Sequence, residues 1–261
     1  MAASVPPLAY LVDRLGGERV ATTVLVPPGT EPHAYEPSPR QIAALADAHL
    51  FVEIGHPAFP FEARFLDHLA ATNPGLQVVE VAAAVELLEA GDDEHDHGEA
   101  MTDPHVWLAP GTMARAAREV AAALVQLDPE HARDVRARLD AFLADIAALD
   151  RRLAAVAAGA KRRSFLVHHA AWTYLAAEYG LDQVAVEAGG REPGPRQLAR
   201  IAETARREGI RVVFVQQGFS PQSAQVLADE LGGRVVALDP MAYDWLATMH
   251  RVADGLEEAL R

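Results

Sequence analysis

The amino-acid sequence predicts an α/β protein made of two doubly wound lobes joined by one long, rigid helix. Two observations support this prediction. Short β-rich runs alternate with amphipathic helical patterns in both halves of the chain, which is typical of parallel sheets with helices on both faces. Between the halves lies one helical pattern of about 30 residues. At 261 residues the chain is also longer than a typical single-core domain, so two domains are expected.

The first half begins with a short strand at residues 2–5 and then alternates helices with strands. Its helical patterns begin at prolines or end at glycines, and its β-rich runs end at turn residues. We expect strands over residues 19–26, 50–54 and 76–81, and helices over residues 7–15, 38–48, 59–71 and from 110 onward.

The connecting helix is predicted from the periodicity of its apolar residues. Asp128 can cap its start, Pro129 fits its first position, and Gly159 ends it. The apolar residues recur at steps of three and four: Val135, Leu139, Phe142, Ile146, Leu149, Leu153 and Val156. About 30 residues at about 1.5 Å each give a rod of roughly 45 Å, which limits how far two domains can swing. We therefore expect an N-terminal lobe over residues 1–127, a linker helix over 128–159 and a C-terminal lobe over 160–261.

The second half resumes the alternation after Gly159. Each β-rich run is followed by a helical pattern, and the last helix reaches almost to the end of the chain. We expect strands over residues 164–167, 183–186, 211–215 and 234–238, and helices over residues 171–179 and 197–208, from 221 onward, and over 244–260.

The composition excludes several classes of function. A formal charge of −14 repels nucleic acids and anionic membrane surfaces, so cations are the better partners. The absence of cysteine excludes thiolate catalysis and leaves imidazole and carboxylate as the strong metal ligands. No apolar run reaches the roughly 20 residues of a membrane span, and residues 1–4 do not resemble the start of a signal peptide. We therefore expect either a cytosolic protein or one whose leader has been removed.

Four residues that can bind a metal ion lie in loops beside predicted strands. His105 lies in the sequence Asp-Pro-His-Val-Trp-Leu of residues 103–108, whereas His33, His169 and Asp239 follow the ends of strands. In open α/β sheets, ligands bind at the carboxyl ends of the strands. If the two lobes face each other, all four side chains reach the cleft between them. Three imidazoles and one carboxylate then form a tetrahedral shell of the kind that zinc prefers.

Residues 89–103 form an acidic segment that contains His95 and His97. It offers too little apolar surface to offset the entropy of ordering, so we expect a loop. The loop is either a weak metal chelator or simply solvated. His168 should point away from His169, because neighbouring residues of a strand face opposite sides. We expect structural or solvated roles for the histidines that lie on or beside predicted helices without a paired ligand: His49, His68, His131 and His250.

The four candidate ligands lie in distinctive sequence segments: Pro32-His33-Ala34-Tyr35-Glu36-Pro37, Asp103-Pro104-His105-Val106-Trp107-Leu108, His169-Ala170-Ala171-Trp172-Thr173-Tyr174 and Leu238-Asp239-Pro240. Together, and in this order, they resemble the metal-binding motifs of the zinc and manganese solute-binding proteins of bacterial ABC uptake transporters. The resemblance covers nearly the whole chain. It implies that His33, His105, His169 and Asp239 are the metal ligands.

The resemblance also implies a function and a location. The implied protein is an extracytoplasmic solute-binding protein, periplasmic or at the cell surface, which captures zinc in the inter-lobe cleft and delivers it to the permease subunit of an ABC transporter. It has no catalytic residue and no nucleic-acid partner, and we expect a monomer. The sequence departs from the family at Pro32, where some zinc-binding members carry a carboxylate. Its first strand is also shorter than usual, which suggests a trimmed mature form.

Three alternative functions stay open at this point. One is an adhesin-like surface protein whose metal is structural, which the sequence does not separate from a transport protein. A binding protein for Mn²⁺ or Fe²⁺ would share the same fold, although three imidazoles favour Zn²⁺, because Mn²⁺ prefers more oxygen ligands. A zinc hydrolase would use three protein ligands, a water molecule on the metal and Glu187 as general base. Catalytic zinc needs an open coordination position, and Asp239 as a fourth ligand would occupy it.

Overall fold

The computed structural model describes residues 1–27, 29–30, 32, 35–44, 47–70, 73–90, 102–187, 193–216 and 222–261. The chain forms two compact units. Unit 1 contains Met1–Leu87, Pro110–Ala148 and Met241–Leu246, and unit 2 contains Leu88–Ala109, Leu149–Pro240 and Ala247–Arg261. Both units are therefore assembled from segments that are far apart in the sequence.

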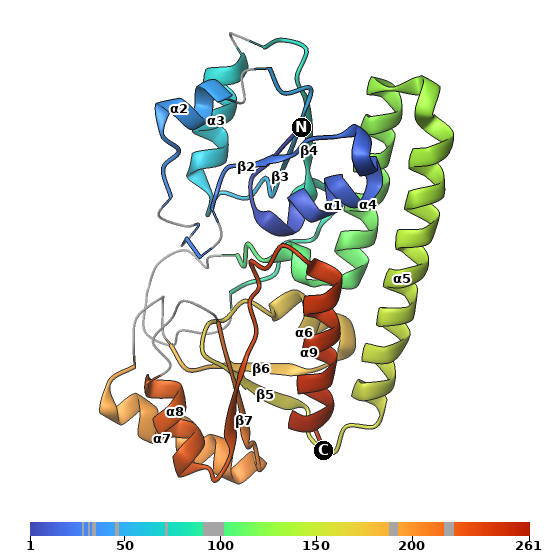
Figure 1. The fold of residues 1–261 in the computed structure, drawn as a ribbon. Coiled ribbons are helices and arrows are strands. Elements are labelled where there is room, and N and C mark those ends of the chain that lie inside the picture. The colour runs from blue at the N-terminus through green and yellow to red at the C-terminus, as the bar shows by residue number, and fades with distance from the viewer. Residues whose placement is uncertain are drawn as a thin grey trace. The chain divides into compact units, whose positions relative to one another are not determined.

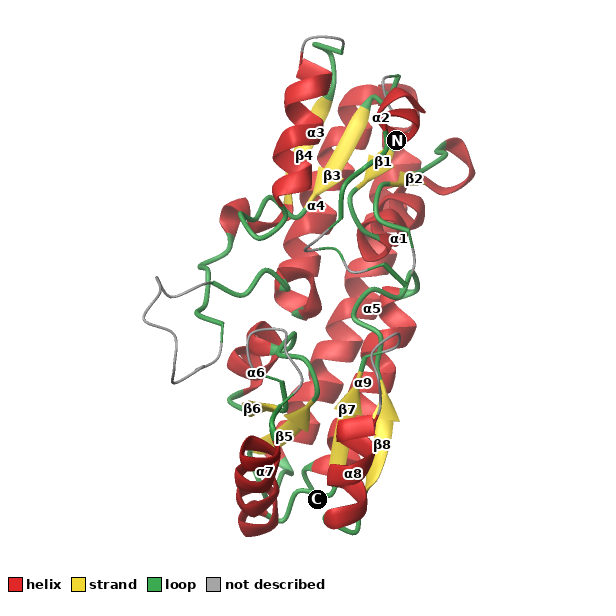
Figure 2. Cartoon of the chain, turned by 90° about the vertical axis from the view of Figure 1, so that its left-hand side faces the viewer, coloured by secondary structure: helices red, strands yellow, loops and turns green. Residues whose placement is uncertain are grey.

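Each unit contains a four-stranded sheet in which neighbouring strands run parallel (Figures 1 and 2). The sheet of unit 1 has the order β2-β1-β3-β4, formed by β1 (Ala2–Ala3), β2 (Thr23–Val24), β3 (Leu50–Glu53) and β4 (Gln77–Glu80). The sheet of unit 2 repeats this order as β6-β5-β7-β8, formed by β5 (Ser164–Val167), β6 (Asp182–Ala185), β7 (Val212–Val215) and β8 (Arg234–Ala237). Where the order reverses, the carboxyl ends of the strands leave room for a ligand.

Helices alternate with these strands, as the sequence predicts. They are α1 (Pro6–Gly16), α2 (Pro39–Ala44), α3 (Pro60–Ala70), α4 (Pro110–Leu127), α5 (Ala132–Ala158), α6 (Thr173–Tyr179), α7 (Pro195–Glu208), α8 (Gln222–Glu230) and α9 (Trp245–Ala259). Short 3₁₀ helices cover Gly17–Arg19, Val81–Ala84, Val106–Leu108 and Pro129–His131. None of the described helices is both long enough and apolar enough to cross a membrane.

Helix α5 confirms the predicted connecting helix. Its 27 residues correspond to about 40 Å of α-helix, and the turn before it is the 3₁₀ helix Pro129–His131. At the predicted apolar positions Phe142, Ile146 and Leu153 are buried, as are Val135 and Leu149, whereas Leu139 and Val156 are half-buried. The helix is continuous through the boundary between the units, since Ala148 belongs to unit 1 and Leu149 to unit 2.

Packing contacts, and not the order of residues along the chain, determine which segments belong to each unit. Leu88–Ala109, which carries His105, belongs to unit 2, although the sequence places it in the N-terminal lobe over residues 1–127. Met241–Leu246 belongs to unit 1, although it lies within residues 160–261. Long-range contacts, which leave no local pattern in the sequence, decide both memberships. The division into 1–127, 128–159 and 160–261 stays a prediction.

The sheet of unit 2 is covered on both faces (Figure 1). Val213 and Val215 of β7 belong to a buried cluster with side chains of α7 and α8. Phe214, between them, faces the opposite side, where its ring lies 6.2 Å from that of Phe165. Helix α9 packs against this side, and a Cβ atom at Gly255 would lie only 2.5 Å from Phe214. Unit 2 is thus doubly wound, as predicted.

Candidate metal centre

The segment that carries His105 is held by contacts just before the histidine. Glu89 and Thr102 form an antiparallel β-bridge, and the amide of Asp103 donates to the carbonyl of Leu88 at 2.8 Å. The hydroxyl of Tyr174, on α6, donates to the carbonyl of Asp103 at 2.7 Å. These contacts anchor the backbone just before His105 to unit 2.

The backbone after His105 is fixed by Trp107. This indole is fully buried, its ring lies 5.3 Å from the His105 ring, and its Nε1 donates to the carbonyl of Pro240 at 2.9 Å. Pro240 follows Asp239 directly, so the contact joins two of the four predicted ligand segments. Trp107 therefore packs beside the candidate ligand and shields it from water.

Asp103 sets the orientation and the tautomer of His105. One carboxylate oxygen, Oδ1, lies 2.7 Å from Nδ1 of the ring and also accepts the His105 amide at 2.8 Å. Burial acts to raise the pKa of Asp103, but the nearby His105 ring and hydrogen bonds from His105 and Thr173 together lower it below its ordinary value. The ionised carboxylate accepts a hydrogen bond from Nδ1–H, which keeps the proton on Nδ1 and leaves the lone pair on Nε2 for a ligand.

His169 is held in the same way by a different carboxylate. It follows β5, and its Nδ1 lies within hydrogen-bonding distance of Oε1 of Glu187, which is buried just beyond β6. The amide of Glu187 donates to the carbonyl of His168 at 3.0 Å, which fixes the carboxylate beside the ring. The His168 ring is buried. Its Nε2 lies 3.4 Å from the hydroxyl of Ser223 and its Nδ1 lies 3.8 Å from Oε2 of Glu187, so both histidines lie near the Glu187 carboxylate.

The two histidines approach each other at their Nε2 atoms. Nε2 of His105 and Nε2 of His169 are 3.4 Å apart, and the ring centroids are separated by 5.1 Å at an interplanar angle of 79°. Two nitrogens bound to one tetrahedral zinc ion at about 2.0–2.1 Å would be about 3.3–3.4 Å apart. Because each Nδ1 faces a carboxylate, both lone pairs converge on the same point. That arrangement suits a cation.

The structure describes only some of the other predicted site residues. His33 lies outside the described residues, as do His95 and His97. Asp239 is half-buried two residues after β8 in unit 2. Within the described residues, no group of three His, Asp or Glu side chains is arranged to hold a metal ion. The structure therefore brings together His105 and His169, and does not group Asp239 with them.

The chain matches a known family over almost its whole length. The sequence model of the family described as ZnuA, zinc-uptake complex component A, periplasmic, matches residues 1–259. The chain belongs to this family. The resemblance expected from the sequence is thereby confirmed. Because ZnuA-family proteins are uptake components and not enzymes, the alternative of a zinc hydrolase is wrong. The contact between Glu187 and His169 gives that carboxylate a different role from general base.

Individual members of the ZnuA family resemble this chain to a similar degree. The zinc-binding lipoprotein AdcA of Streptococcus pneumoniae serotype 4 is 30% identical over 244 residues, which are 90% of this chain and 48% of AdcA. The high-affinity zinc uptake system protein ZnuA of Bacillus subtilis is 30% identical over 248 residues, which are 90% of this chain and 76% of that protein. The chain thus spans about half the length of AdcA.

A solved structure confirms the fold of the ZnuA family for this chain. A crystal structure of ZnuA superimposes with a TM-score of 0.87 at 35% sequence identity, and the match covers 100% of this chain and 98% of the other. Two α/β lobes with parallel sheets, expected from the sequence, are therefore confirmed.

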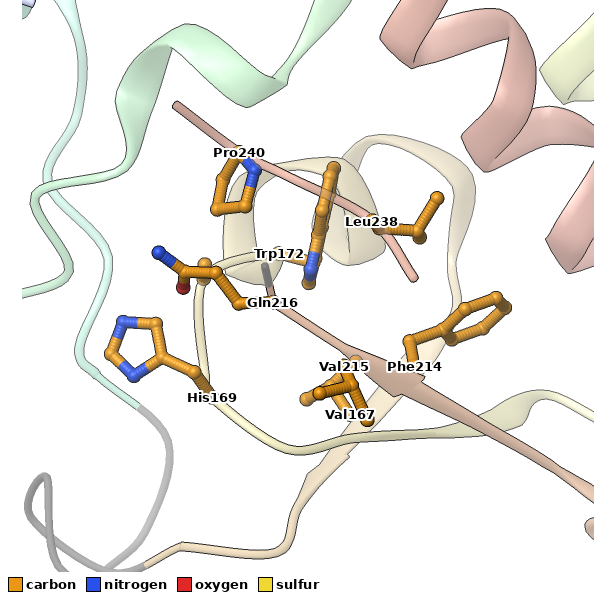
Figure 3. A pocket seen from close by; sticks show the side chains of 9 residues that line it. Val167, His169, Trp172, Phe214, Val215, Gln216, Leu238 and Pro240 are labelled. Carbon is orange, nitrogen blue, oxygen red and sulfur yellow. The ribbon is translucent and has the colours of Figure 1, made fainter. Parts of the chain in front are cut away.

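Local sequence patterns assign no role to two residues at this candidate metal centre. Asp103 holds His105, and its place two residues before the histidine is the signal for it in the sequence. Gln216, just after β7, lines a small cavity together with His169, Trp172 and Pro240 (Figure 3). Its neighbour Gln217, which the sequence places at the strand end, lies outside the described residues.

Replacing Asp103 by asparagine tests whether the carboxylate prepares His105 for a metal ion. The change keeps the shape of the side chain but removes the negative charge that fixes the Nδ1 proton. We expect zinc affinity to fall about 10- to 100-fold, the usual effect of losing such a partner. Competition with a chromophoric chelator measures the affinity. The matched control is Asp182→Asn, at an exposed position of the same unit, which should leave the affinity unchanged. An unchanged affinity in Asp103→Asn would show that the carboxylate is dispensable.

Proposed function

We propose that this protein is an extracytoplasmic binding protein that captures Zn²⁺ and passes it to the permease of an ABC transporter. The observation that carries the proposal is the separation of 3.4 Å between Nε2 of His105 and Nε2 of His169, each ring being held at Nδ1 by a buried carboxylate. The names of the relatives support it, because AdcA is described as zinc-binding and ZnuA as a zinc uptake protein.

The proposed ligands are His33, His105, His169 and Asp239. Neutral imidazoles bind zinc well but do not offset its charge. The carboxylates of the site must therefore compensate the positive charge of the ion. Asp103 and Glu187 lie behind the rings, and Asp239 would supply a third carboxylate. Three imidazoles favour Zn²⁺ over Mn²⁺ or Fe²⁺, which prefer more oxygen ligands. A manganese- or iron-binding member of the family is the second candidate.

The proposed partner and location follow from the family. Zinc-uptake component A is described as periplasmic, and AdcA is a lipoprotein. We infer a location outside the cytoplasmic membrane and docking to an ABC permease, with the protein acting as a monomer. Release to the permease requires the affinity to fall on docking. The hydrogen bonds at Tyr174 and Pro240 hold the His105 segment in place, so a permease that displaced this segment would separate the two imidazoles.

Calorimetry of chelator-stripped protein tests this function. We expect one tight Zn²⁺ site per chain, and Zn²⁺ should displace Mn²⁺ when the two ions compete. Asp239→Ala should weaken zinc binding by about 100-fold, since it removes a charged ligand, and Asp182→Ala, at an exposed position, is the control.

Three results would contradict parts of the proposal. The absence of tight zinc binding in the wild type would overturn the function as a whole. A preference for Mn²⁺ in the competition would favour the second candidate. Wild-type affinity in Asp239→Ala would remove Asp239 from the ligand set while leaving the two histidines in place.

A further inference from the structure

Gln216 is a polar residue at the candidate metal centre whose side-chain carbonyl oxygen has no hydrogen-bond partner among the described residues. It directly follows β7, at the same carboxyl edge of the unit 2 sheet as His169. Its Oε1 is inaccessible to solvent and makes no hydrogen bond within the described part of the chain. In Figure 3 the amide points toward the His169 ring.

None of the described residues donates a hydrogen bond to this oxygen. The cavity that Gln216 shares with His169 is otherwise lined mainly by apolar groups, among them Val167, Val215 and Leu238. A buried carbonyl oxygen without a donor has lost its hydration and gained nothing in return, so it destabilises the fold. Native proteins rarely keep such a group unless it has a role.

Gln183, elsewhere in unit 2, shows how this chain satisfies a glutamine that has a structural role. Its Oε1 accepts the amide of Trp172 at 2.7 Å, and its Nε2 donates to the hydroxyl of Thr173 at 3.2 Å. Both ends of that amide are thus used within the protein. Oε1 of Gln216, in contrast, accepts no hydrogen bond from the described residues, although Gln216 and Trp172 line the same cavity.

We propose that Gln216 belongs to the metal-binding machinery and determines affinity through its Oε1 atom. This inference rests on the proposed function, because it requires a cation at the point where His105 and His169 converge. An amide oxygen carries a partial negative charge, and an apolar, water-poor cavity strengthens its attraction to a dication. Since the side chain is neutral, it adds an oxygen to the site without adding a charge. The unpartnered oxygen is then satisfied only when the metal ion is bound.

Replacing Gln216 by leucine separates this role from a structural one. Leucine has a similar size and suits the apolar wall, so the metal-free variant should melt about 2–4 °C higher than the wild type. Its dissociation constant for Zn²⁺ should rise about tenfold. The variant should thus gain thermal stability and lose zinc affinity. If Gln216 had a structural role, its replacement would instead lower the melting temperature. Gln183→Leu is the matched control, and its metal-free form should melt at a lower temperature, because the buried amide of Trp172 loses its acceptor.

The melting temperature of the metal-free protein and zinc affinity by chelator competition are the two measurements. A lower melting temperature together with unchanged zinc affinity in Gln216→Leu would overturn the inference. If the wild type binds zinc and Gln216→Leu binds it equally well, only this inference fails. If the wild type binds no zinc, the proposed function fails and this inference fails with it.

Discussion

His169→Ala is expected to weaken Zn²⁺ binding about 100- to 1,000-fold. Structural zinc sites of four ligands are worth roughly 10–16 kcal/mol, so one ligand contributes on the order of 3–4 kcal/mol. The substitution removes one of two nitrogens that lie 3.4 Å apart and also leaves the buried carboxylate of Glu187 without its ring partner. Competition with a chelator of known affinity measures the effect in protein stripped of metal.

The control for this experiment is His131→Ala. His131 also has its Nδ1 beside a carboxylate, 2.9 Å from Oδ1 of Asp128, but it lies in the 3₁₀ helix Pro129–His131 and no other candidate ligand is near it in the described residues. Its replacement should leave zinc affinity unchanged. A His169→Ala variant that binds zinc within threefold of the wild type would remove His169 from the ligand set.

Glu53→Gln is expected to make the protein more stable at alkaline pH. Glu53 ends β3, is 3% exposed, and has no hydrogen-bond partner for Oε2 among the described residues. Nearby, the carboxylate of Glu62 accepts the amides of Ile54 and Gly55, both at 2.9 Å. Two buried carboxyl groups therefore lie close together in unit 1. Glu62 accepts two backbone hydrogen bonds, whereas Oε2 of Glu53 accepts none from the described residues.

Burial is the main cause of the shifted pKa values of these two carboxyl groups. Together with the smaller effects of the charges of Glu62 and Glu80, it raises the pKa of Glu53 from 4.5 to about 8. Burial also raises the pKa of Glu62 to about 7, against the lowering effect of its hydrogen bonds. Between pH 4.5 and 8 the folded protein thus keeps a proton on Glu53 that the unfolded chain releases.

The sign of the pH dependence follows from this difference. The stabilisation linked to Glu53 is fully present below pH 4.5 and is lost as the pH rises through about 8. A glutamine keeps the neutral shape at every pH, so Glu53→Gln should exceed the wild type by a few kcal/mol near pH 9 and resemble it near pH 5.

Thermal or urea unfolding at these two pH values measures the effect. Glu119→Gln, at an exposed position of α4, is the control and should follow the wild type at both. A wild-type stability that does not decline between pH 5 and pH 9 would show that Glu53 ionises at its ordinary pKa.

Local patterns in the sequence predicted most of the elements and one half of the site. Apolar residues at steps of three and four gave helix α5, because that face is buried along its length. The strand predicted over residues 164–167 is observed as Ser164–Val167, so His169 lies at a strand end as expected. His105 and His169 were predicted as ligands because imidazole binds metal ions, and in the structure their Nε2 atoms lie 3.4 Å apart.

The remaining features depend on contacts between distant segments. Leu88–Ala109 joins unit 2 through Tyr174 and Pro240, which lie far along the chain from it. No local pattern records such hydrogen bonds. The unpartnered oxygen of Gln216 is likewise a property of the side chains around it, so only the folded structure reveals it.

The placement of His105 and His169 within a single unit also has a kinetic meaning. Two nitrogens that are already oriented receive an arriving ion without first ordering the chain, so the rate of capture depends on diffusion and on how fast the ion sheds water. Any ligand that joins afterwards acts on how long the ion stays. In the function proposed above, a change at a ligand that joins after the two histidines would therefore alter the lifetime of the loaded protein more than the speed of capture.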